Sequence, residues 1–181
     1  MRTIDILVQN YFSANRTEGL TNFFYIFTTL FDFTIYFIFI SLCVAGLIYL
    51  VRNIKYAIFF LSTLFVSAVI VYLMKLFFDV ARPAGGLFSA FGQSFPSYHA
   101  TEATVFFVLV MFVFNDYWGR YSKVMFNFLC ILAIFLVAIS RVYLGVHWFS
   151  DVFWGVVLGS VISYIAIFSF KSVIKVQSHR L

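Results

Sequence analysis

Two histidines in this chain have neighbouring residues that suit a nucleophile and a general acid. His147 lies four residues before Asp151, so the two side chains share one face of a helix. A carboxylate hydrogen-bonded to one ring nitrogen sets the tautomer and makes the other nitrogen more nucleophilic. His99 follows Pro96 and Ser97, and an imidazole with a pKa of about 6.5 can donate a proton at neutral pH. We therefore predict that His147, Asp151 and His99 are catalytic.

Three basic residues accompany these histidines: Lys75, Arg82 and Arg141. Cations gathered in a low-dielectric site repel one another unless an anion compensates them. The planar guanidinium group of arginine suits phosphate oxygens, and lysine adds a point charge. Ser97 adds a hydroxyl donor at the start of a helix, where free backbone N–H groups attract anions. These residues predict a site that binds a phosphate group.

Two simpler interpretations compete with this one. Each cation alone could extend separately to a membrane surface, and His147 with Asp151 also has the spacing of a pair of metal ligands. Three cations beside two histidines favour a shared anion, and their charge opposes a divalent metal. We expect neither a metal nor another cofactor.

The composition places the chain in a membrane. Of its 181 residues, 64% are hydrophobic and 10% are charged, whereas soluble domains carry roughly 25% charged residues. The net charge of +5 does not indicate a nucleic-acid partner, because the basic residues are scattered between apolar runs and form no stripe. We expect an all-α integral membrane protein.

Five apolar runs have about the length of 20 residues that a bilayer span needs. Before them, Ile4, Leu7 and Tyr11 recur at helical spacing, which predicts an amphipathic helix lying on the membrane. We therefore expect residues 1–32 to form an N-terminal interfacial segment and residues 33–181 to form a transmembrane domain. The five expected spans are about 33–51, 56–78, 97–114, 124–140 and 148–170.

Alternation of these spans puts the histidines and their cations at one end of the bundle. Seven other basic residues gather at the opposite end, whereas Arg2 and Arg16 lie on the side of the histidines, and the positive-inside rule places the richer end in the cytoplasm. We therefore expect a multi-pass protein of the cell membrane whose active site is on the extracytoplasmic face. The residues expected at the cytoplasmic end are Arg52, Lys55, Arg120, Lys123, Lys171, Lys175 and Arg180.

The spacing of the chemical residues resembles a known three-part signature. The resemblance is to the type-2 phosphatidic acid phosphatase superfamily, which includes lipid phosphate phosphatases, glucose-6-phosphatase and soluble vanadium haloperoxidases. It covers residues 75–151 of this chain. The parts are Lys75-x6-Arg82-Pro83, then Pro96-Ser97-x-His99, then Ser140-Arg141-x5-His147-x3-Asp151.

The resemblance implies a role for each matching residue. His147 would form a phosphohistidine, Asp151 would orient that histidine, and His99 would protonate the leaving group. The family works without a metal, which agrees with the charge argument. The residues that would bind the phosphate are Lys75, Arg82, Ser97, Tyr98 and Arg141.

Tyr98 departs from the family's pattern, which usually has glycine at this position. A tyrosine still supplies a backbone N–H, so a contact to the phosphate survives if φ at Tyr98 is negative. Its ring would narrow the pocket or touch the lipid headgroup. The departure bears on substrate fit and rate more than on the class of reaction.

Two other features allow alternative interpretations. Glu102 lies one turn after His99 and could hydrogen-bond that histidine, or could be a carboxylate favoured near a helix N-terminus. Gly155 and Gly159 form a GxxxG motif, which allows close packing either within the bundle or between two copies of the chain. The oligomeric state stays open.

The resemblance implies a membrane phosphatase that hydrolyses a lipid phosphate or diphosphate. Undecaprenyl diphosphate is the first candidate substrate, with phosphatidic acid and phosphatidylglycerophosphate as alternatives, because the motifs recognise the phosphate and not the tail. A lipid phosphotransferase or an anion transporter would also use such cations. Transport would need ionisable residues deep in the spans, and the apolar interiors contain few. The expected partners are the lipid substrate and the bilayer.

Overall fold

The structure is a computed structural model that describes residues 2–32, 34–88 and 92–178. The described residues form helices joined by turns and loops, and they contain no strand. The helices are α1 (Arg2–Ala14), α2 (Glu18–Asp32), α3 (Thr34–Val51), α4 (Ile54–Phe78), α5 (Tyr98–Phe114), the short 3-10 helix η1 (Asn115–Tyr117), α6 (Arg120–Tyr143) and α7 (Phe149–Ser178).

The predicted all-α membrane fold is confirmed. Among the described helices, α4, α5 with η1, α6 and α7 are long and apolar enough to cross a bilayer. The remaining expected span, 33–51, corresponds to α3, which has 18 residues. At 1.5 Å per residue α3 is about 27 Å long, close to the roughly 30 Å of a bilayer's hydrocarbon core. Counted together with η1, α5 has 20 residues, so α3 is the shortest of the five.

Polar residues at the helix starts explain where two of the spans begin. The side chain of Asn53 accepts hydrogen bonds from the backbone N–H groups of Lys55 and Tyr56, which would otherwise be unpaired at the start of α4. Ser97 does the same for Ala100 at the start of α5. These caps fix the level in the bundle at which each helix starts.

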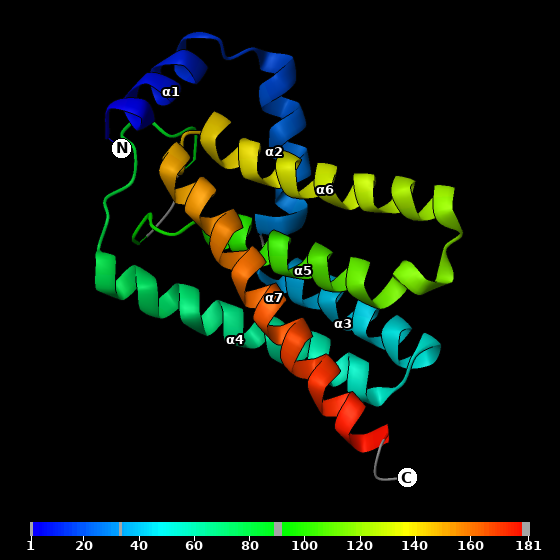
Figure 1. The fold of residues 1–181 in the computed structure, drawn as a ribbon. Helices are drawn as coiled ribbons and strands as arrows, with labels where there is room; N and C mark the ends of the chain where they lie inside the picture. Colours follow the sequence, from blue (N-terminus) through cyan, green and yellow to red (C-terminus); the bar gives the residue numbers. More distant parts are fainter. Residues whose placement is uncertain (1, 33, 89–91, 179–181) are drawn as a thin grey trace.

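Helix α5 is the central element of the bundle. It packs against α4, α6 and α7 (Figure 1), and its side chains Val105, Leu109 and Val113 form the core with Phe60 and Leu64 of α4. By contrast, the outward faces of the other helices expose large apolar side chains along their length. Such an outer surface is typical of helices surrounded by lipid.

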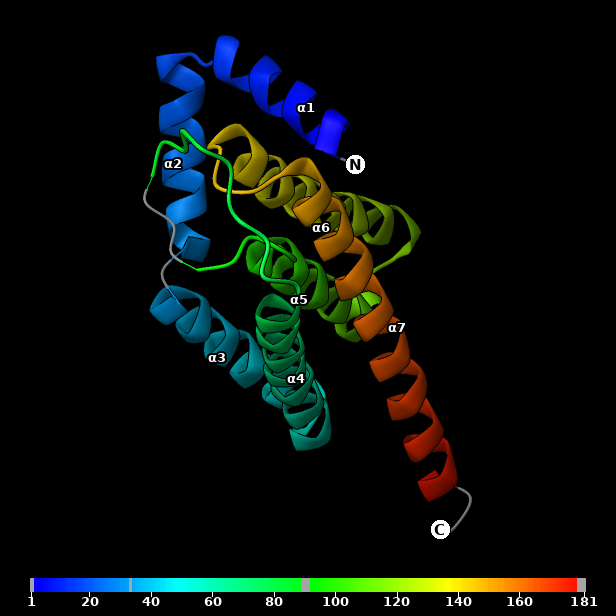
Figure 2. The same cartoon turned by 90° about the vertical axis from the view of Figure 1, so that its left-hand side faces the viewer.

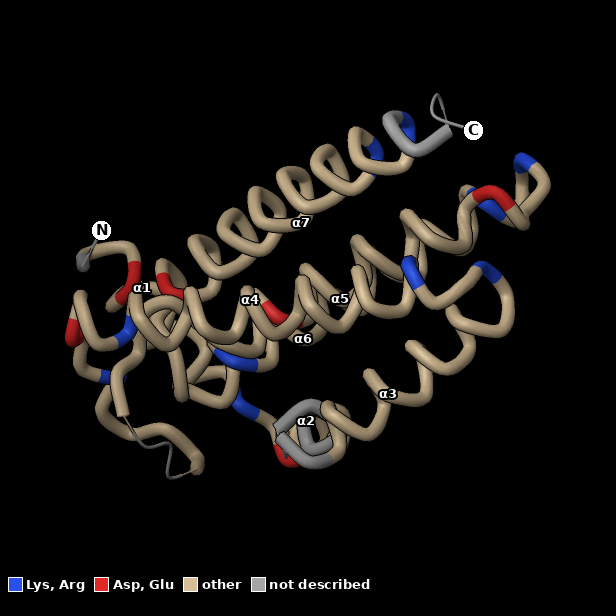
Figure 3. The backbone as a smooth tube through the Cα atoms, turned by 90° about the horizontal axis from the view of Figure 1, so that it is seen from below, with Lys and Arg blue, Asp and Glu red and all other residues tan. Residues whose placement is uncertain are grey.

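Charged residues mark the two ends of the bundle. In Figure 3 the basic segments lie mostly toward the ends of the long helices. At one end, Arg52 forms an ion pair with Asp116 at 2.9 Å and donates to the carbonyl of Val113. At the other end, α4 and α6 finish and α5 and α7 begin. The three parts of the predicted signature, which we refer to as the three clusters, therefore lie together.

The N-terminal helices cover the end that holds these clusters. Helix α2 runs transverse to the long helices (Figures 1 and 3), and the turn before it is fastened to α6 by a bond from Arg16 Nε to the carbonyl of Tyr143. Within the expected interfacial segment, the described residues thus form two helices, α1 and α2. The boundary expected between residues 32 and 33 stays a prediction, because Phe33 lies outside the described residues.

Helix α1 turns two polar residues toward the protein. Asp5 and Gln9 are buried, whereas Ile4, Leu7 and Tyr11 are 56%, 64% and 65% exposed. Other apolar side chains of this helix pack against the buried core. The helix is amphipathic, and its exposed apolar side chains are free to contact lipid.

The GxxxG motif packs α7 onto α5. A methyl group on Gly155 would lie 2.9 Å from the carbonyl oxygen of Ser97, and one on Gly159 would lie 2.7 Å from that of Thr101. Both distances are too short for real contacts, so the two glycines let the helix backbones approach closely. The motif therefore acts within the bundle.

Substituting Gly159 with alanine should force α7 away from α5. We expect Gly159→Ala to lower the free energy of unfolding by about 1–3 kcal/mol, the usual cost of overpacking. Gly46→Ala is the matched control, because a methyl group there meets nothing within 4 Å, and alanine in a helix gains up to about 1 kcal/mol. Thermal unfolding in detergent measures both, and equal midpoints would contradict the packing role.

Candidate active site

The first turn of α7 and the loop before it hold His147 against Asp151. Both residues are buried, and His147 Nδ1 lies 3.4 Å from Asp151 Oδ2. The Asp151 carboxylate also accepts a short hydrogen bond from Ser94 Oγ and one of 2.9 Å from the backbone N–H of Trp148. These two donors hold the carboxylate in place, so it faces the Nδ1 side of the imidazole ring.

The other ring nitrogen of His147 faces a cation. Arg82 Nη1 lies 3.2 Å from His147 Nε2. Because a guanidinium group can only donate, Nε2 must accept this hydrogen bond and the proton of the neutral ring must be on Nδ1. This is the tautomer in which Nε2 carries the lone pair of a nucleophile.

Burial keeps the His147 imidazole neutral. It lowers the pKa of His147 to about 3, an effect opposed by the hydrogen bond to Asp151 and reinforced by the charges of Arg82 and Lys75. The charged ring is disfavoured because the site offers it little water and already contains cations. At neutral pH the predicted nucleophile is therefore unprotonated at Nε2.

The predicted phosphate-binding cations come together at this end. Lys75 Nζ donates to the carbonyl of Gln93 at 2.6 Å, and Arg82 donates to the carbonyls of Gly92 at 3.0 Å and Val146 at 2.7 Å. Burial lowers the pKa of Arg82, Asp151 raises it, and the nearby charge of Arg141 lowers it further. A phosphate here would replace neutral carbonyl acceptors with charged ones, whose hydrogen bonds are roughly twice as strong.

The start of α5 is joined directly to the start of α7. The backbone N–H of Ser97 donates to the carbonyl of Asp151 at 3.0 Å. Ser97 is the N-cap residue of α5, and His99 follows in its first turn with its ring perpendicular to that of Tyr98 at a centroid distance of 5.8 Å. The structure thus places the first turn of α5, which carries His99, beside the start of α7.

Tyr98 has an ordinary helical backbone. It is the first residue of α5, and among the described residues Asp79 alone is a non-glycine residue with positive φ. The backbone N–H of Tyr98 is therefore directed as in any helix N-terminus, and the departure from glycine costs no backbone strain.

Three further residues support the site without having been predicted for it. Asp5 of α1 accepts hydrogen bonds from the backbone N–H and the hydroxyl group of Ser150, both at 2.8 Å. Ser94 holds Asp151, and Trp148 Nε1 donates to the carbonyl of Ala81 at 2.8 Å. Asp5 lies 145 residues from Ser150 in sequence, and helical spacing gives no signal for so distant a contact.

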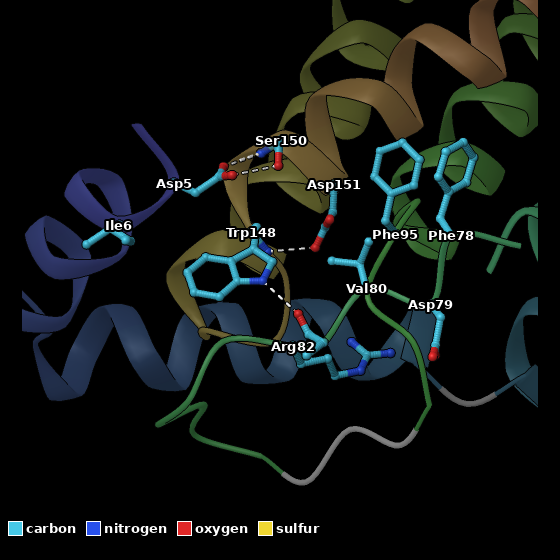
Figure 4. A pocket seen from close by; sticks show the side chains of 11 residues that line it. Asp5, Ile6, Phe78, Asp79, Val80, Arg82, Phe95, Trp148, Ser150 and Asp151 are labelled. Carbon is cyan, nitrogen blue, oxygen red and sulfur yellow. Dashed lines mark hydrogen bonds between the residues drawn. The ribbon is translucent and has the colours of Figure 1, made fainter. Parts of the chain in front are cut away.

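A cavity of about 740 Å³ lies beside the site, and its lining includes Asp5, Trp148 and Asp151 (Figure 4). Asp5 and Ser150 form one edge of it, and Asp151 points into the middle. Its walls are largely apolar, from Ile6, Phe78, Val80, Phe95 and Trp148.

The part of the chain that the structure describes holds no cluster of three or more His, Cys, Asp or Glu residues suited to a metal ion. The pairing of His147 with Asp151 is instead surrounded by Arg82 and Lys75.

A family model for the PAP2 superfamily matches residues 55–174 of the chain, which include all three clusters. The chain belongs to the PAP2 superfamily. This membership confirms the resemblance seen in the sequence and the expected class of enzyme, a phosphatase. Among curated proteins, none is significantly similar to this PAP2 protein in sequence.

Two solved structures share the fold of this PAP2 protein. A transmembrane PAP2-type phosphatidylglycerolphosphate phosphatase from Bacillus subtilis matches with a TM-score of 0.86 and 21% identity, over 94% of this chain and 86% of that chain. LpxE from Aquifex aeolicus matches with a TM-score of 0.73 and 22% identity, over 90% of this chain and 93% of that chain. At these identities the likeness concerns the fold.

Removing the Asp5 carboxylate should loosen the first turn of α7. We expect Asp5→Ala to lower kcat for phosphate release about 5- to 30-fold, the effect of two lost hydrogen bonds, with a smaller change in KM. Asp5→Asn should recover most of this loss, because an amide can accept from the Ser150 N–H and donate to its hydroxyl oxygen.

Steady-state kinetics of the two Asp5 variants measure this effect, with Asn10→Ala on the exposed face of α1 as the control. If Asp5→Ala keeps the wild-type kcat, Asp5 does not position the site.

The titration of His147 is directly measurable. A folded-state pKa lowered from 6.5 to about 3 means that the neutral ring persists as pH falls from 7 to 4, where an ordinary imidazole becomes protonated. NMR of protein labelled with ¹⁵N-histidine should therefore show one ring that stays neutral at pH 5, and that signal should vanish in His147→Gln. A midpoint near pH 6.5 for His147 would contradict the burial argument.

Proposed function

We propose that the protein hydrolyses a lipid phosphate through a phosphohistidine formed on His147. The main support for the proposal is the surroundings of the His147 ring, in which Nδ1 faces Asp151 and Nε2 faces Arg82. A neutral imidazole held in this way has its lone pair among the cations that would bind a phosphate.

In the first step, His147 Nε2 attacks phosphorus and the bond between phosphorus and the leaving oxygen breaks. His99 gives its proton to that oxygen, so a lipid alcohol leaves, or a lipid monophosphate if the substrate is a diphosphate. Lys75, Arg82 and Arg141 stabilise the charge on the three other phosphate oxygens, together with the free N–H groups at Ser97 and Tyr98.

In the second step, His99 accepts a proton from water, and the hydroxide oxygen bonds to phosphorus as the bond from phosphorus to Nε2 breaks. Inorganic phosphate leaves, and His147 returns to its neutral state with the proton still on Nδ1. Asp151 orients the ring in both steps and stabilises the positive charge that the ring carries in the intermediate.

We further propose that the reaction takes place at the extracytoplasmic face of the cell membrane, with the lipid tail remaining in the bilayer. The distribution of basic residues supports this orientation. The proposed substrates are a polyprenyl diphosphate such as undecaprenyl diphosphate, or a glycerolipid such as phosphatidic acid or phosphatidylglycerophosphate. Both classes present a terminal phosphate to the same cations.

Phosphate release by the purified full chain in detergent tests the proposal with both classes of lipid. We expect His147→Ala to lower kcat at least about 1,000-fold, as loss of a nucleophile does. Lys55→Ala is a control, because Lys55 lies at the opposite end of the bundle. Near-normal release by His147→Ala would mean that another group attacks phosphorus.

The two roles of His99 can be separated with an aryl phosphate, whose leaving group needs little protonation. His99→Ala should then still form the phosphoenzyme but hydrolyse it slowly, so radioactive phosphate accumulates on the protein. The label should be stable to base and labile to acid, as a phosphorus–nitrogen bond is.

A further inference from the structure

A second cavity opens on the side of the bundle, between α3, α4 and α5. It has a volume of about 230 Å³, and we refer to it as the lateral cavity. Most of its lining is apolar and comes from α3 and α4, which lie side by side (Figure 2). Residues that define it are Phe37 and Ser41 of α3, Leu64 and Ala68 of α4, and Tyr98 and Glu102 of α5.

The lateral cavity adjoins the catalytic end of the bundle. Tyr98 lies between Ser97 and His99 in the chain and is part of the lining of the lateral cavity. Glu102 lies one helical turn further along α5, which is about 6 Å at 1.5 Å per residue. If the phosphate of a lipid is bound near His99, the part of the lipid next to the phosphate would therefore lie at the depth of Tyr98 and Glu102.

Ser41 presents an unused hydrogen-bond donor to the lateral cavity. Its side chain is 5% exposed, and its hydroxyl group has no hydrogen-bond partner among the described residues. By comparison, the buried hydroxyl groups of Thr63 and Ser163 donate to carbonyls of their own helices, those of Phe59 and Gly159. A buried hydroxyl group without a partner is costly unless a ligand completes it.

Glu102 makes a second polar feature in the same cavity. It is buried within a membrane-spanning helix, and it accepts a short hydrogen bond from Ser67 of α4. The sequence allowed a hydrogen bond between Glu102 and His99. In the structure, the hydrogen bond of Glu102 is instead to Ser67 of the neighbouring helix α4. Ionisable residues inside membrane spans are expensive and mark functional sites by default.

We propose that the lateral cavity binds the ester-bearing glycerol segment of a glycerophospholipid phosphate, with the Ser41 hydroxyl donating to an ester carbonyl. This inference rests on the proposed function and selects among its substrates. The ester carbonyls of such a lipid are a few bonds from the phosphate and only accept hydrogen bonds, so they match a lone hydroxyl donor.

A polyprenyl diphosphate does not match this cavity. Beyond its phosphates the chain is hydrocarbon, so it would fill the cavity while leaving the Ser41 hydroxyl group unpaired. The cavity therefore discriminates between the two substrate classes by its polar groups, in a region that the phosphate-binding residues do not reach.

The test compares three lipids with the purified full chain in detergent: diester phosphatidic acid, its diether analogue, which lacks both carbonyls, and undecaprenyl diphosphate. We expect kcat/KM for the diester to exceed that for the diether about 3- to 10-fold, the effect of one hydrogen bond. Undecaprenyl diphosphate should be hydrolysed more slowly than the diester.

Ser41→Ala should bring the diester down to the level of the diether and leave the diether unchanged. Ser163→Ala is the matched control, because Ser163 is equally buried but its hydroxyl bonds to its own helix. The wild-type comparison of diester with diether needs no variant, so it decides the question even if Ser41→Ala fails to fold.

Equal turnover of diester and diether by the wild type, or preferred turnover of undecaprenyl diphosphate, would overturn this inference while leaving the phosphatase proposal intact. Equal losses on diester and diether in Ser41→Ala would overturn it as well. Absence of phosphate release from all three lipids would instead overturn the proposed function, and this inference with it.

Discussion

A buried carboxylate, that of Asp151, is the constraint on which the catalytic end of this molecule depends. Asp151 is 1% exposed, so protein donors must satisfy most of the hydrogen-bonding capacity of its carboxylate. Ser94 and the Trp148 N–H supply hydrogen bonds, and His147 faces the same oxygen atom. The Asp151 carbonyl in turn accepts the Ser97 N–H. Satisfying this one residue therefore brings together the loop before α5, the start of α5 and the start of α7, which is what a site built from three separate clusters requires.

The same end also has to compensate its cations. Arg82 and Lys75 donate to backbone carbonyls of the loop that Ser94 belongs to, so the loop that holds Asp151 also occupies the cations. Arg82 contacts His147 Nε2 as well. A phosphate bound here would compete with the carbonyls for the guanidinium group, and in doing so would free the lone pair of Nε2. Binding of a phosphate would thus be coupled to exposure of the Nε2 lone pair, because the guanidinium group of Arg82 takes part in both.

The sequence predicted features that depend on residues close to one another in the chain. Apolar runs predicted the spans, since a lipid-facing helix must be apolar along its whole length. The spacing of His147 and Asp151 predicted their pairing, but the expected reason was wrong, because His147 lies in the loop before α7 and the two residues do not share a helix face. Asp5 and Ser94 could not be found in this way, because their partners are distant in sequence and their positions follow from tertiary packing. The GxxxG motif states only that two backbones approach closely, so it took the contact of Gly159 with Thr101 to place that approach inside the bundle. For α1 the pattern predicted two faces, but not that Asp5 would turn toward α7.

The position of Tyr98 explains how this chain can depart from its family's usual glycine without losing the chemistry. Its backbone belongs to the helix start that faces the phosphate, and its conformation is one that any residue adopts. Its side chain points away from that role, into the lining of the lateral cavity that also holds Ser41 and Glu102. A substitution at this position therefore changes the surroundings of the lipid below its phosphate while the N–H groups above stay as they were. Because main chain and side chain serve different parts of the substrate, reaction class and lipid preference can vary independently at this one residue.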